Sequence, residues 1–181
     1  MRPATGHATG WLLNSTTVVT AGHCVLTRNK ENERLILESA EIIGGFKGRK
    51  TDKAVDRRYG CRVVIPEEYW KSQVWQGDVA LIKVSPEFPS STKPFSCSDT
   101  PKSGTRRVGV VGYPTDKCDG ERMYESYEVM ALQPVGGLLK HNIDTYTGTV
   151  GTQIPNTYPL EKFSSSANQG SRQLRLSDSP H

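Results

Sequence analysis

The stretch WLLNSTTVVTAGHC, residues 11–24, decides how this chain folds. Residues 11–13 are apolar, residues 14–15 are the turn formers Asn and Ser, and residues 16–20 read Thr-Thr-Val-Val-Thr. Aromatic and β-branched residues suit the pleated, half-buried surface of a sheet, so we predict a β-hairpin here. A histidine, His23, closes the β-branched run, just after a glycine and beside a cysteine.

Short apolar stretches separated by glycine and proline continue through most of the chain. We predict further strands at residues 40–46, 61–65, 79–84, 107–112, 123–132 and 138–143. Prolines at 86, 89 and 94 interrupt regular structure and mark a linker at about 85–104. Neither a long helical period nor an internal repeat is present, which favours an all-β barrel class. A length of 181 residues suits one domain or two small packed barrels.

Composition narrows the function classes. The net charge is +4, the hydrophobic content is 35% and the mean hydropathy is −0.54, which suggests a soluble protein with a modest core. No run approaches the roughly 20 apolar residues of a spanning helix, and the first residues as written carry no apolar core of a secretory signal. Basic and acidic residues interleave, as at 28–38, so we expect neither a nucleic-acid partner nor a membrane.

The four cysteines are widely spaced and form no C-x-x-C motif, so no metal or redox site is expected. An oxidising compartment with two disulfides is the preferred interpretation, and four cysteines allow three connectivities. We favour Cys24–Cys61 and Cys97–Cys118, because each bridge would then join neighbouring segments. Four buried thiols in a reducing compartment are the alternative.

Residues 149–181 differ from the rest of the chain. They are rich in Ser, Asn, Gln and Pro and show no sustained alternation. So little apolar surface cannot offset the entropy of ordering a segment, so we predict that this stretch is mostly disordered.

His23 and Asp78 are the candidates for chemistry. Acyl transfer from a peptide needs a nucleophile, a base, a group that orients the base, and donors for the oxyanion. The imidazole of His23 suits the base because it titrates near neutral pH. The carboxylate of Asp78, in the stretch GDVALIKV at 77–84, suits the orienting role. Either residue alone would more often be a surface or capping residue.

The sequence TAGHC at 20–24 resembles the element that carries the general-base histidine of chymotrypsin-like serine peptidases. The stretch at 77–84 resembles the aspartate element of the same family, and DTYTGTVG at 144–151 stands where the family has Gly-x-Ser-Gly. The order His, Asp, nucleophile also matches. This resemblance covers roughly residues 8–148 and implies two perpendicular six-stranded barrels with the catalytic cleft between them.

A subgroup resemblance rests on other segments. GYPTDK at 112–117, MYES at 123–126 and the pair Asp144-Thr145 are similar to glutamyl endopeptidases. The resemblance implies a secreted, monomeric endopeptidase that acts on polypeptides without a cofactor or metal and prefers an acidic P1 residue. Such enzymes read the acidic side chain partly with a histidine downstream of the nucleophile. No matching segment exists here, so this specificity is not carried over.

The chain departs from the family at the nucleophile. Val150 occupies the serine position, so His23 has no hydroxyl there to deprotonate, and the oxyanion loop includes Gly148. Losing a triad member costs orders of magnitude in rate, so we expect an inactive homologue. The predicted fold is an all-β, chymotrypsin-like double β-barrel, N-terminally short and with an incomplete second barrel.

The expected organisation is a first barrel at 1–100 carrying His and Asp, a partial second barrel at 101–148, and the tail at 149–181. The stretch at 148–151 can be encoded as GGG-ACA-GTC-GGG, which one base later, with one further A, reads Gly-Gln-Ser-Gly. An out-of-frame tail is therefore one hypothesis. A non-catalytic binding module and a chain that does not fold stably are the others, the last because incomplete barrels expose strand edges.

Overall fold

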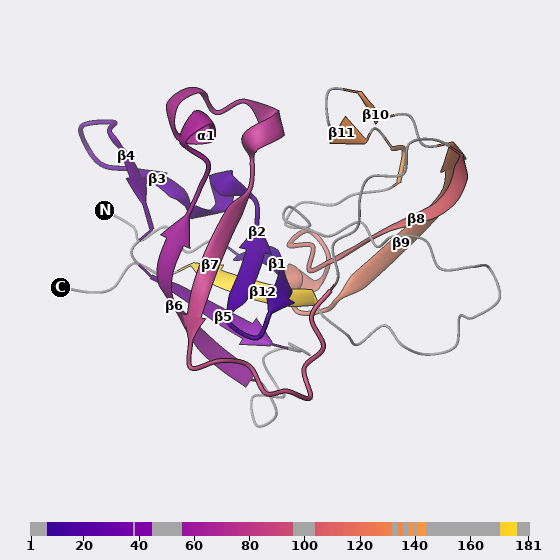
Figure 1. Cartoon of the computed structure of the whole chain (residues 1–181), viewed down its shortest axis with the longest axis horizontal. Coiled ribbons are helices and arrows are strands. Elements are labelled where there is room, and N and C mark those ends of the chain that lie inside the picture. The colour runs from indigo at the N-terminus through magenta and orange to yellow at the C-terminus, as the bar shows by residue number, and fades with distance from the viewer. Residues whose placement is uncertain are drawn as a thin grey trace.

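The computed structural model describes residues 7–37, 39–44, 56–95, 104–131, 134–135, 138–139, 141–143 and 171–176. Strands dominate this part of the chain (Figure 1). The strands of the first half are β1 (His7–Asn14), β2 (Thr17–Thr20), β3 (Leu26–Arg28), β4 (Arg34–Ile36), β5 (Ala40–Gly44), β6 (Asp56–Val64) and β7 (Ala80–Ser85). The later strands are β8 (Thr105–Gly112), β9 (Tyr124–Ala131), β10 (Pro134–Val135), β11 (Leu138–Leu139) and β12 (Ser171–Leu176).

Helical turns are few and short among the described residues. They are the 3₁₀ turns η1 (Gly22–Val25), η3 (Trp75–Gly77) and η4 (Cys118–Gly120) and the helix α1 (Glu67–Ser72). The predicted all-β class is therefore confirmed. None of the described helices is long and apolar enough to cross a membrane.

Six strands close into a barrel in the order β1-β12-β5-β6-β7-β2. The predicted hairpin is confirmed as β1 and β2, and its turn is held by Asn14, whose side-chain oxygen accepts the backbone N–H of Thr16 at 3.0 Å. The predicted strand at 61–65 proves longer, because β6 begins at Asp56. The strand predicted at 138–143 is shorter, since β11 ends at Leu139.

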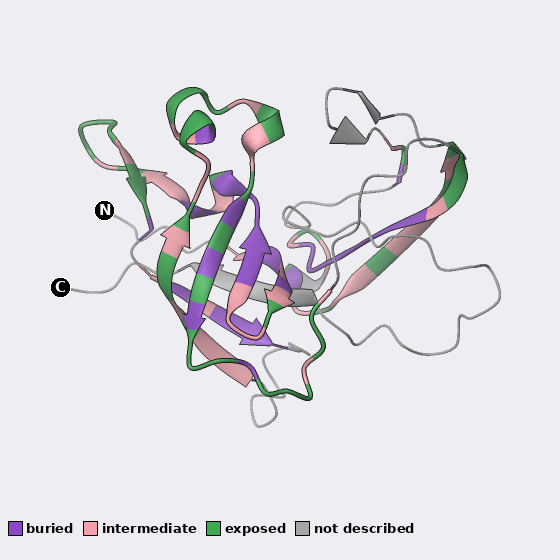
Figure 2. Cartoon of the chain, viewed as in Figure 1, coloured by how far each residue is buried: buried purple, intermediate pink, exposed green. Residues whose placement is uncertain are grey.

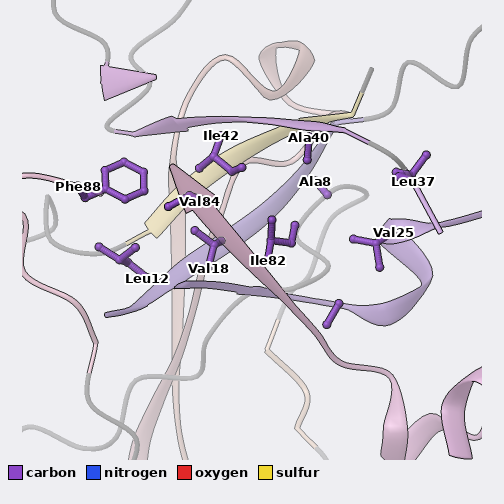
Figure 3. Packing of buried hydrophobic residues seen from close by; sticks show 11 residues of the cluster. Ala8, Leu12, Val18, Val25, Leu37, Ala40, Ile42, Ile82, Val84 and Phe88 are labelled. Atoms are coloured by element: carbon purple, nitrogen blue, oxygen red, sulfur yellow. The ribbon is translucent and has the colours of Figure 1, made fainter. Parts of the chain in front are cut away.

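The barrel core is filled by alternate residues of its strands. In β7, Ala80, Ile82 and Val84 are buried while the residues between them are exposed, so one face of the strand points inward (Figure 2). The buried cluster comprises Ala8, Leu12, Val18, Val25, Leu37, Ala40, Ile42, Ala80, Ile82, Val84 and Phe88. Figure 3 shows these side chains gathered in the space that the strands enclose.

Strand β12 lies between β1 and β5 and is antiparallel to both. Its register pairs Leu174 with Ala8 on one side and with Ile42 on the other. In Figure 1 it is the yellow arrow that crosses the barrel. This strand belongs to the stretch for which composition predicted disorder, and the other residues of 149–181 lie outside the described ones.

Among the described residues, strands β8 to β11 form two separate two-stranded sheets and no closed barrel. β8 and β9 form a long antiparallel hairpin beside the barrel, from Thr105↔Ala131 to Gly112↔Tyr124 (Figure 1). β10 and β11 form a second two-stranded sheet. Tyr113, directly after β8, joins the two parts, because its backbone N–H donates to Thr9 Oγ1 in β1 at 2.9 Å. The expected incomplete second barrel is thus confirmed in the described part of the chain.

Candidate active site

The pairing of β2 with β7 brings the two candidate residues to the same end of the barrel. These strands are antiparallel, and Thr20, the last residue of β2, stands opposite Ala80, the first residue of β7. His23 follows Thr20 by one short turn, and Asp78 lies two residues before the start of β7. The separation of 55 positions in the sequence therefore does not keep the two candidates apart.

His23 is held at the end of a rigid strand. The residues before it are buried, and Thr20 donates its hydroxyl to the carbonyl of Thr9 at 2.9 Å. After the extended residue Ala21, the chain enters η1, and the N–H of Cys24 donates to the carbonyl of Ala21 at 3.1 Å. This tight turn projects His23 out of the barrel end, so that 48% of its side chain remains exposed.

Asp78 closes the 3₁₀ turn η3. Its backbone N–H donates to the carbonyl of Trp75 at 3.1 Å. Its carboxylate accepts two hydrogen bonds from one residue, from the ring Nδ1 of His23 to Oδ2 at 2.7 Å and from the backbone N–H of His23 to Oδ1 at 2.9 Å. Because the two contacts use both carboxylate oxygens, the orientation of Asp78 relative to the imidazole is fixed at two points.

The electrostatics favour an ionised pair. The pKa of His23 is raised from 6.5 to about 9, first by a hydrogen bond with the Cys24 side chain and also by Asp78, while burial acts in the opposite direction. Burial tends to raise the pKa of Asp78, but the hydrogen bonds from His23 and then from Tyr69 lower it overall. At neutral pH the site therefore holds an imidazolium beside a carboxylate.

The arrangement assigns separate roles to the two ring nitrogens. With Nδ1 held by Asp78, Nε2 is the nitrogen that can accept a proton from an attacking group. Above its pKa of about 9, His23 is a neutral base in the correct tautomer. This is the base half of an acyl-transfer site.

The remaining predicted site residues lie elsewhere. Gly148 and Val150 are outside the described residues, so the structure brings together His23 and Asp78 alone. Among the described residues, no group of three or more His, Cys, Asp or Glu could hold a metal ion.

The expected Cys24–Cys61 disulfide is wrong, because both cysteines are free. Cys24 packs against the barrel core. Cys61 is exposed where the register of β6 shifts between Gly60 and Arg62, and its Sγ lies 3.4 Å from the carbonyl of Lys83. One thiol thus faces the core and the other faces solvent. The Cys97–Cys118 pairing falls outside the described side chains and stays a prediction.

Sequence reasoning missed Tyr69, a buried residue of α1 that hydrogen-bonds to Asp78. Nothing in the pattern around Tyr69 marks it as part of the site. The one trace in the sequence was Gly22 beside His23, because a missing side chain there leaves room for a large neighbour.

Comparisons with known proteins agree with this geometry. The model of the family described as Trypsin matches residues 3–153. A glutamyl endopeptidase of Bacillus licheniformis is 28% identical over 151 residues, which is 82% of this chain and 45% of that protein. Trypsin eta of Drosophila melanogaster is 34% identical over 80 residues, 44% of this chain and 27% of that protein. The chain thus spans less than half the length of these curated relatives.

The fold has a counterpart among solved structures. A Glu endopeptidase in complex with MPD superposes with a TM-score of 0.64 at 17% sequence identity, covering 94% of this chain and 80% of that one. At this identity the likeness concerns the fold. It shows that this chain shares the fold of that protein.

Proposed function

The chain belongs to the trypsin family of chymotrypsin-like serine peptidases, and on that premise we propose that it is a serine endopeptidase homologue that does not hydrolyse peptide bonds as it stands. His23 is the general base and Asp78 the carboxylate that orients it. The observation that carries these roles is the two-point contact of Asp78 with the ring and the backbone of His23.

Loss of activity follows from the nucleophile position. A valine side chain carries no hydroxyl, so Val150 offers neither an attacking oxygen nor a proton for Nε2 to accept. Without the nucleophile, substrate binding and oxyanion stabilisation alone retain only a small fraction of the family's catalytic rate. The substrate class is polypeptide, and by family resemblance we place the protein outside the cell as a monomer.

An active-site fluorophosphonate probe tests this function. We expect no labelling of the chain and no hydrolysis of peptide ester substrates, with His23→Ala as the matched control. Labelling that disappears in His23→Ala would reveal a serine nucleophile elsewhere and would contradict the proposed inactivity.

Restoring the hydroxyl is a second test. We expect Val150→Ser to recover little activity, because the stretch after Gly148 departs from the family and would still leave the oxyanion loop without its downstream support. Recovery to the rate of an active family member would show that the valine is the whole defect.

A binding module is the second candidate, favoured by the valine at position 150. A pure binder has no physical need for a carboxylate that orients an imidazole, so the His23–Asp78 geometry argues for catalytic ancestry. If the chain only binds polypeptide, His23→Ala should leave the affinity for an unfolded casein unchanged.

A further inference from the structure

We propose that Tyr69 is a positioning residue that holds Asp78 against His23 by packing between the two turns that carry them. This role deepens the proposed function, since it assumes that the His23–Asp78 pair is the base of the site. Tyr69 lies in α1, between β6 and η3, and only 4% of it is exposed. It is thus a buried aromatic residue in direct reach of the catalytic pair.

The packing of Tyr69 depends on two glycines. A Cβ at Gly22 would lie 2.5 Å from Cε1 of Tyr69 and 3.1 Å from Oδ1 of Asp78. A Cβ at Gly77 would lie 3.1 Å from Cβ of Tyr69. Gly22 directly precedes His23, and Gly77 directly precedes Asp78. Tyr69 therefore packs against the backbone just before His23 and just before Asp78, where a side chain at position 22 would clash with the ring and one at position 77 would be tight.

A hydrogen bond adds to this packing. The hydroxyl of Tyr69 donates to the carboxylate of Asp78, which also accepts the ring and backbone N–H groups of His23. Burial, and then the bond to Asp78, raise the pKa of Tyr69 to about 12, so the hydroxyl remains a donor at all working pH values. Asp78 thus has donors from α1 as well as from η1, and these restrict rotation of its carboxylate.

The chain end of α1 keeps Tyr69 in place. The backbone carbonyl of Tyr69 accepts the N–H of Gln73 at 2.9 Å. Gln73 adopts a left-handed conformation with φ 53°, which ends the helix. The turn that follows leads directly into η3 and Asp78. Tyr69 and Asp78 are therefore tied through the backbone as well as through their side chains.

Tyr69→Phe isolates the hydroxyl, because the ring and its packing remain. We expect the pKa of Asp78 to rise and the downfield NMR signal of the His23 Nδ1–H proton to weaken through faster exchange with water. Tyr59→Phe is the matched control, since Tyr59 is 60% exposed on β6. If Tyr69→Phe matches Tyr59→Phe in both readouts, Tyr69 only fills space and the positioning role is refuted.

Gly22→Ala tests the packing separately. The added methyl group would meet the Tyr69 ring and Asp78, so we expect the pKa of His23 to fall from about 9 toward 6.5 as the pair separates. An unchanged pKa of His23 in this variant would refute the proposed packing role of Tyr69. Both readouts need no hydrolysis, so they fail independently of the proposed function, which the fluorophosphonate probe tests.

Discussion

Replacing Asp78 with asparagine should destabilise the protein most at about pH 5 and least above about pH 9. The pKa of His23 is raised from 6.5 to about 9 in the folded state. The positive charge of His23 therefore stabilises the fold fully below pH 6.5, and this stabilisation is lost as the pH rises through about 9. The pKa of Asp78 is lowered, so its contribution is present above the ordinary aspartate range and is lost on acidification. The charge-dependent stabilisation therefore has its maximum between these limits.

The size of the expected destabilisation follows from the pKa shift of His23. A rise of the His23 pKa from 6.5 to about 9 corresponds to an upper limit of about 3 kcal/mol, at about 1.4 kcal/mol for each tenfold change in proton affinity. The Cys24 side chain contributes first to this rise, and Asp78 supplies only a part. Because 48% of the His23 side chain is exposed, solvent screening reduces the part lost in Asp78→Asn to about 1 kcal/mol.

Urea unfolding of the wild type and of Asp78→Asn at about pH 5, 7 and 9.5, in low and in high salt, measures this difference. Asp56→Asn is the matched control, since Asp56 pairs with Arg58 at 2.5 Å and has no histidine partner in that ion pair. We expect the effect of the control to be constant over this pH range. A difference for Asp78→Asn that is constant, or that grows toward alkaline pH, would show that the charge of His23 is not stabilised by Asp78.

Three further outcomes can be measured. Ile82→Ala should lower the free energy of unfolding, measured in urea, by about 3 kcal/mol, because Ile82 is fully buried. Leu81→Ala, on the outer face of β7, should lower it by less than about 1 kcal/mol. Equal losses would contradict the assignment of Ile82 to the inward face of β7. Deleting residues 171–181 should abolish the amide exchange protection of β5 and promote aggregation, and retained protection would mean that β12 does not pair there. Iodoacetamide should alkylate Cys61 faster than the core-packed Cys24, and peptide mass mapping that finds the two cross-linked would be inconsistent with free thiols.

Local patterns predicted the elements whose residues agree with their surroundings. The hairpin at 11–20 carries its own turn former, Asn14, and β7 carries an apolar run interrupted only by Lys83. His23 and Asp78 could be found because each stands in a distinctive stretch at the end of such a strand. These signals lie within a few residues of the feature that they predict.

The features that sequence reasoning missed depend on distant partners. The strand prediction at 61–65 left out the first half of β6, where Arg57 pairs with Glu41 at 2.5 Å across the sheet. Tyr69 became visible only when Gly22 and Asp78 were brought beside it. The Cys24–Cys61 bridge was chosen from chain order alone, which contains no information on which face of the barrel each thiol occupies.

The place of β12 in the barrel sets the order of events during synthesis. His7 pairs with Arg175, so one edge of the first described strand stays uncovered until residues far along the chain have been synthesised. A nascent chain emerging from the ribosome can form the β1–β2 hairpin at once, but its barrel stays open until residue 176 has been released. Until β12 has been made, such a chain needs protection of two bare strand edges, one on β1 and one on β5.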